Sequence, residues 1–126
     1  MHVDDPSILY FASKHQTYAP DFFETYQICS ERDIAVQTIK SIARGPWSAD
    51  AKRNYTTWYQ PLDQEEDIQQ SVSWLLSHQG LFLNSVGEID LLPAVFRSAA
   101  NFGNKPNDIQ MQDLSERMGL SSIFGI

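Results

Sequence analysis

The sequence predicts an α/β protein whose strands lie parallel in one sheet. Two short apolar segments, 34–39 and 81–84, have the composition of buried strands. A helical pattern lies between them, and other helical patterns precede the first segment and follow the second. Because a strand, a crossover helix and a second strand form a unit with parallel strands, we expect the two segments to lie side by side and parallel.

The amino-terminal part is expected to be an irregular lead-in followed by a helix. Residues 1–18 follow no clear period, and a short apolar run within them fits either a strand or a packed loop. From Pro20 the pattern is helical, with Phe22, Tyr26 and Cys29 on one face. We interpret Cys29 as a small core residue.

The first strand, 34–39, is apolar and rich in β-branched residues, as in a strand buried on both faces. Lys40, Ser41 and Arg44 follow it, and a Gly-Pro pair then stops the run. Ligands of α/β proteins gather at the carboxyl ends of the strands. This loop is therefore a candidate binding segment.

Residues 45–62 are expected to form a long loop, which is unusual unless the loop has a function. Its aromatic residues are Trp47, Tyr55, Trp58 and Tyr59. They either anchor the loop to the protein surface or belong to a lid over a site. The anchoring interpretation is favoured, because aromatic side chains supply contact area more often than chemistry.

Three more helices are expected. The first begins with Asp63 as its cap, carries an apolar stripe from Ile68 to Leu76, and ends before Gly80. The strand 81–84 follows. Asp90 opens the next helix, which has Pro93 in its first turn and Gly103 after its last; the final helix runs from the cap Asn107 to Gly119, and an apolar tail, 123–126, is expected to dock.

The composition indicates one domain of 126 residues, divided into the lead-in 1–18, the mixed region 19–103 and the carboxyl-terminal helix and tail 104–126. The formal charge of −7 argues against nucleic acid or an anionic membrane as a partner. One cysteine excludes a disulfide framework. With neither a membrane span nor a signal-peptide pattern in the sequence, we expect a cytoplasmic protein.

Four motifs follow one another in the chain: IKSIARGPW at 39–47, TWYQPL at 57–62, FLNSVG at 82–87 and LLP at 91–93. With these motifs the chain, from about residue 21 onward, resembles the carboxyl-terminal part of the aldo/keto reductase family. The resemblance implies a partial (β/α)8 TIM barrel that comprises the last two βα units and the carboxyl-terminal helices. Such members reduce aldehydes or ketones with a nicotinamide cofactor and without a metal.

The resemblance also implies that the loops after the two strands bind the pyrophosphate and the adenosine end of NAD(P)H. The matching residues are Lys40, Ser41, Ile42, Arg44, Asn84, Ser85 and Gly87. Small residues and a following helix N-terminus suit a phosphate, whereas Glu88 and Asp90 add negative charge and leave the choice between NAD and NADP open. From the residues alone, the two cations can equally be solvated loop residues, and Asn84 and Ser85 can simply complete strand-end hydrogen bonds.

The family's catalytic Tyr, Lys, Asp and His lie on earlier strands, and no residue of this sequence matches them. Tyr55 and His78 are not candidates for these roles, because a lone His near a helix end more often serves the helix. We therefore expect the chain alone to be inactive and the complete barrel to bind the cofactor and a carbonyl substrate. The amino-terminal half of the barrel is then an expected partner. The alternative is a non-catalytic protein-interaction module that reuses a half-barrel.

Overall fold

The computed structural model describes residues 2–3 and 19–121. The remainder of the predicted lead-in and the apolar tail lie outside the described residues. The described elements are β1 (His2–Val3), α2 (Ala19–Glu31), β2 (Val36–Thr38), β3 (Ala43–Pro46), β4 (Tyr59–Pro61), α3 (Glu65–Leu76), β5 (Leu81–Leu83), α4 (Leu92–Ala100) and α5 (Asp108–Met118).

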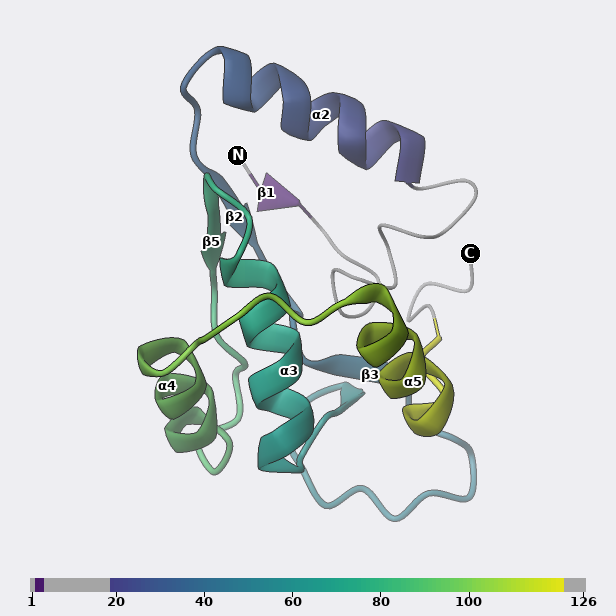
Figure 1. Ribbon diagram of the computed structural model, residues 1–126. Helices are drawn as coiled ribbons and strands as arrows, with labels where there is room; N and C mark the ends of the chain where they lie inside the picture. Colours follow the sequence, from purple (N-terminus) through teal and green to yellow (C-terminus); the bar gives the residue numbers. More distant parts are fainter. Residues whose placement is uncertain (1, 4–18, 122–126) are drawn as a thin grey trace.

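Three short strands, in the order β1-β2-β5, form a parallel sheet (Figure 1). Val36 of β2 pairs with Leu81 of β5, and Thr38 pairs with Leu83. The prediction that these two segments lie side by side and parallel is confirmed, and the protein belongs to the α/β class. The described strands do not close into a barrel.

Along β2 and β5 the sheet is buried on one face only, which corrects the expectation for 34–39. The strand is shorter than predicted, and within it Val36 and Thr38 are buried whereas Gln37 is exposed. On β5, Phe82 is 54% exposed, and Gln37 and Phe82 are register partners. Ile34 lies outside the strand because its N–H donates to Cys29 O at 2.8 Å, so it completes the end of α2.

Residues 45–62 are not a structureless loop. β3 and β4 pair antiparallel, with Pro46 opposite Tyr59, and together they form a hairpin. Trp47 and Tyr59 are buried, and Trp47 Nε1 donates to Thr57 O at 2.9 Å across the hairpin. These contacts confirm the anchoring interpretation for Trp47 and Tyr59.

Helix α3 packs against β5, α4 and α5 and supplies much of the core (Figure 1). Ile68, Val72 and Leu75 are buried, as the apolar stripe predicts. The predicted start is wrong: Gln64 is the N-cap, without a side-chain bond, and Asp63 instead accepts a hydrogen bond from Tyr55 at 3.2 Å.

Helix α5 lies where the sequence predicts it, whereas α4 begins later than predicted. α4 begins after Leu91, not at Asp90, and no side chain caps it. α5 begins with a capping box between Asn107 and Gln110 and ends at Gly119 in the left-handed conformation, which confirms that prediction.

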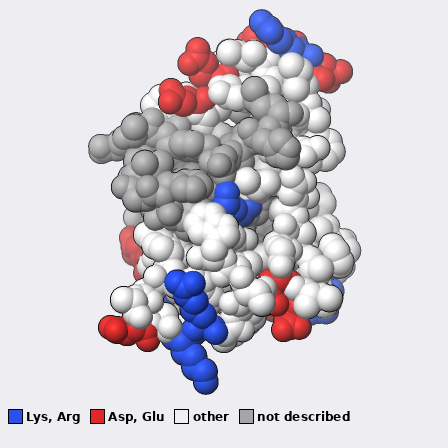
Figure 2. Space-filling view, turned by 180° about the vertical axis from the view of Figure 1, so that it is seen from behind, with Lys and Arg blue, Asp and Glu red and all other residues white. Residues whose placement is uncertain are grey.

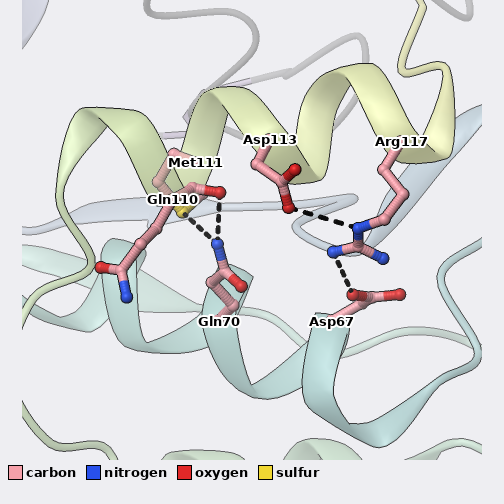
Figure 3. Close-up of polar contacts among 6 residues, drawn as sticks. All are labelled: Asp67, Gln70, Gln110, Met111, Asp113 and Arg117. Carbon is pink, nitrogen blue, oxygen red and sulfur yellow. Dashed lines mark hydrogen bonds and ion pairs between the residues drawn. The ribbon is translucent and has the colours of Figure 1, made fainter.

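Polar contacts fix α5 onto α3 (Figure 3). Arg117 lies between two carboxylates, at 3.0 Å from Asp67 and 3.3 Å from Asp113. Gln70 Nε2 donates to Gln110 O at 2.6 Å. The Asp67 side chain is only 6% exposed, so the Arg117 guanidinium balances a largely buried charge.

Candidate functional site

The carboxyl ends of β2 and β5 meet at one edge of the sheet, because the strands are parallel neighbours. The N–H of Asn84 donates to Thr38 O at 2.9 Å, so the loops after the two strands begin side by side. All the residues predicted to bind the cofactor lie on these two loops or at the start of β3. They are Lys40, Ser41, Ile42, Arg44, Asn84, Ser85 and Gly87.

Lys40 turns the chain at the end of β2. Its φ of 58° is in the left-handed region, which residues with a Cβ seldom adopt. The N–H of Ala43 donates to Lys40 O at 2.9 Å and closes the turn. The Lys40 ammonium lies 5.6 Å from the centre of the Trp58 ring, within the range of a cation–π contact. An uncommon backbone conformation of this kind is often found at binding sites.

Ser41 and Ile42 are buried and hold the loop to the core. The Ser71 hydroxyl of α3 donates to Ser41 O at 2.7 Å, and the N–H of Leu62 donates to Ile42 O at 2.7 Å. Their carbonyl groups are thus used inside the fold. The Ser41 hydroxyl lies 3.4 Å from the Thr38 hydroxyl, and both side chains are buried.

Arg44 connects β3 to the end of α5. Its Nε donates to Met118 O at 2.5 Å, and the N–H of Ser121 donates to Arg44 O at 3.1 Å. A guanidinium at the carboxyl end of a helix satisfies an open carbonyl and interacts favourably with the helix dipole. These contacts give Arg44 a structural role, whatever it does with a ligand.

The loop after β5 carries both predicted and unpredicted contacts. Asn84 Nδ2 donates to Gln37 Oε1 at 3.4 Å, whereas Ser85 and Gly87 are exposed. The next residue, Glu88, is buried, and its Oε2 accepts from Thr56 N at 2.7 Å and Thr56 Oγ1 at 2.6 Å. These hydrogen bonds lower the pKa of Glu88 below its usual value.

Sequence reasoning missed Thr56 and Trp58 as part of this edge. Both come from the hairpin: Thr56 contacts the loop after β5, and Trp58 contacts Lys40 in the loop after β2. Trp58 is 55% exposed. Burial alternates along β4, with Tyr59 and Pro61 buried, so a predicted strand at 59–61 would have indicated that Trp58 faces away from the core.

Figure 2 shows the back of the molecule, on which blue Lys and Arg side chains lie at the top, near the middle and, as a longer group, at the bottom. Within 2–3 and 19–121, no group of three or more His, Cys, Asp or Glu side chains could hold a metal ion. In the same residues, no helix is long and apolar enough to cross a membrane.

Two other features are separate from this edge. A pocket of about 360 Å³ lies near the amino ends of β2 and β5, and its described lining includes Tyr26, Asp33 and Gly80 but none of the predicted site residues. His78 follows α3, with Nδ1 at 2.8 Å from Trp74 O, and burial lowers its pKa. As predicted, His78 serves the helix end.

Comparison with known proteins gives no match: neither a protein-family model, nor a curated protein, nor a solved structure is significantly similar to this chain.

Proposed function

We propose that this chain forms the cofactor-binding edge of an aldo/keto reductase-like (β/α)8 barrel, which uses NAD(P)H to reduce aldehydes or ketones. The observation that carries the proposal is the meeting of the loops after β2 and β5 at one edge of a parallel strand pair. The two loops start at adjacent strand ends. Lys40 lies in the first loop, and Ser85 and Gly87 lie in the second.

The strand order supports this proposal. β1, β2 and β5 follow one another in space as they do in the chain, and each neighbouring pair is parallel. This arrangement is the one that a barrel wall requires, and it also occurs within each half of a doubly wound sheet. In a barrel the face with Gln37 and Phe82 would be covered by the remaining strands, which are the proposed partner.

The loop chemistry suits the pyrophosphate that NADH and NADPH share. Lys40 supplies a positive charge, and Gly87 has no atom within 4 Å of the position that a Cβ would take, so a phosphate has room to approach the main chain. The N-terminus of α4 follows a few residues later and adds positive potential. The carboxylate of Glu88 is engaged by Thr56.

Replacing Lys40 by alanine is expected to weaken the binding of NADPH and NADH about tenfold, because one charge-assisted phosphate contact of about 1.5 kcal/mol is lost. Isothermal titration of the complete barrel, this chain together with its amino-terminal half, measures both affinities. Lys105→Ala is the matched control, since Lys105 also lies over a tryptophan, Trp74, at 5.9 Å, but belongs to the linker before α5.

Arg44→Ala tests whether Arg44 contributes to the stability of the fold as well as to cofactor binding. We expect it to lower the free energy of unfolding by about 1–2 kcal/mol through loss of the Met118 contact. If Lys40→Ala and Arg44→Ala both leave the affinities for NADPH and NADH unchanged, the cofactor proposal is wrong.

The exposed sheet face also favours a second candidate, the protein-interaction module. Phe82 is exposed on β5, which has β2 as its one neighbour among the described strands. Under the barrel proposal, uncovered Phe82 should cause the chain to self-associate as its concentration rises, and Phe82→Gln should reduce this. Phe96→Gln, on the exposed side of α4, is the control. A wild-type chain that stays monomeric in light scattering would favour the module.

A further inference from the structure

Residues of the hairpin that lie just before β4 contact the two loops of the candidate site. Thr56 hydrogen-bonds to Glu88, which directly follows Gly87, and Trp58 lies against the ammonium group of Lys40. Residues 56–58 thus contact both loops, although they are far from each in the sequence. The hairpin therefore forms a third side of the candidate site, in addition to the loops after β2 and β5.

Trp58 differs from the other tryptophans of the chain. Trp47 and Trp74 are buried, whereas more than half of the Trp58 surface is exposed. Large exposed aromatic side chains that lie beside a cation are suited to stacking on planar rings, because the ring contact and the charge act on neighbouring parts of one ligand. A nucleotide combines a planar base with phosphate groups of the opposite charge to Lys40.

We infer that Trp58 stacks on the adenine ring of the cofactor while Lys40 contacts the adjoining phosphate. This inference rests on the proposed function and adds to it a base-binding residue outside the two predicted loops. The Lys40 ammonium lies over the Trp58 ring, 5.6 Å from its centre, so the charge and the ring are already adjacent before a ligand binds.

The hairpin gives this ring a fixed position. Tyr59, the next residue, is buried, and its ring meets the Trp58 ring edge to face, with centres 5.5 Å apart and planes at 86°. Thr57 Oγ1 donates to Tyr59 O at 2.7 Å, and Thr57 O accepts from Trp47 Nε1. A preorganised stacking surface loses little conformational entropy when a base binds.

Replacing Trp58 by alanine tests the inference directly. We expect Trp58→Ala to weaken NADPH binding about 5- to 150-fold, the equivalent of one lost base–aromatic stack. Trp58→Phe keeps a stacking ring and should bind within a few-fold of wild type. Phe96→Ala, an exposed aromatic residue on α4, is the control and should leave binding unchanged.

Fluorescence identifies the ring that binds. ADP should quench the emission of the exposed Trp58, whereas nicotinamide mononucleotide should not, and Trp58→Phe should abolish the quenching by ADP. Quenching by nicotinamide mononucleotide alone would overturn the assignment to adenine.

The failure of this inference can be distinguished from the failure of the proposed function. If wild type binds NADPH and Trp58→Ala binds it equally well, or if the Phe and Ala variants lose the same affinity, stacking by Trp58 is wrong and the cofactor edge stands. If the complete barrel with the wild-type sequence binds neither NADPH nor NADH, both proposals fail. Far-ultraviolet circular dichroism of each variant confirms that the protein compared is folded.

Discussion

Replacing Leu75 by alanine is expected to lower the free energy of unfolding by about 2–5 kcal/mol. Leu75 lies in α3 and is 1% exposed, so the substitution removes buried methyl groups and leaves a cavity among well-packed neighbours. Because α3 contacts β5, α4 and α5, a cavity here affects the packing of three other elements. A loss of this size is a large part of the total stability of a small domain.

Urea unfolding followed by circular dichroism measures this effect. Leu76→Ala is the matched control, since Leu76 is the next residue of the same helix and only half-buried, so its loss should be clearly smaller. Equal losses for the two variants would contradict the burial pattern of α3. The site should respond as well, because Ser71, one turn before Leu75, holds the carbonyl of Ser41.

Local patterns in the sequence were enough to predict the elements that depend on local physics. The apolar stripe of α3 has the period of a helix, and its buried face is the predicted one. The ends of α5 are fixed by neighbouring residues, Asn107 with Gln110 and Gly119. The parallel pairing of β2 and β5 followed from the helix between them.

The hairpin could not be predicted, because the residues of β3 and β4 are not typical of strands and because a long segment separates the two strands in the sequence. β3 contains Gly45 and Pro46, and β4 ends in Pro61, residues that are unfavourable in strands. The predicted cap at Asp63 failed for a related reason. The carboxylate of Asp63 is bonded to Tyr55 of the hairpin, a contact that cap preferences do not include.

The candidate site likewise has a part that the sequence predicts and a part that it does not. The position of the two loops at one edge followed from strand order, but the partners of the individual side chains did not. The Arg44 side chain donates a hydrogen bond to Met118 O, 74 residues away. Lys40, whose φ is positive, contacts Trp58. Long-range contacts of this kind have no local signal, so the sequence could not distinguish a ligand-binding cation from a structural one.

Tyr59→Ala is expected to lower the free energy of unfolding by about 3–5 kcal/mol, because it removes a buried aromatic ring from the core. It should also weaken nucleotide binding, since the Trp58 ring rests against Tyr59. Tyr59→Phe keeps the ring and is the matched control, with an expected change below about 1 kcal/mol. Near-equal stabilities of the two variants would show that the ring does not anchor the hairpin.

The pH dependence of stability tests the burial of Tyr59 independently. Burial raises the pKa of the Tyr59 phenol above its ordinary value of 10.0. As the pH rises through about 10, the unfolded chain therefore loses this proton before the folded chain does, and stability falls with further increase in pH. Tyr55, whose pKa is also raised, contributes in the same direction. Urea unfolding at a series of alkaline pH values should therefore show a shallower fall for Tyr59→Phe than for wild type, and identical slopes would mean that the phenol is not buried when the hairpin is folded.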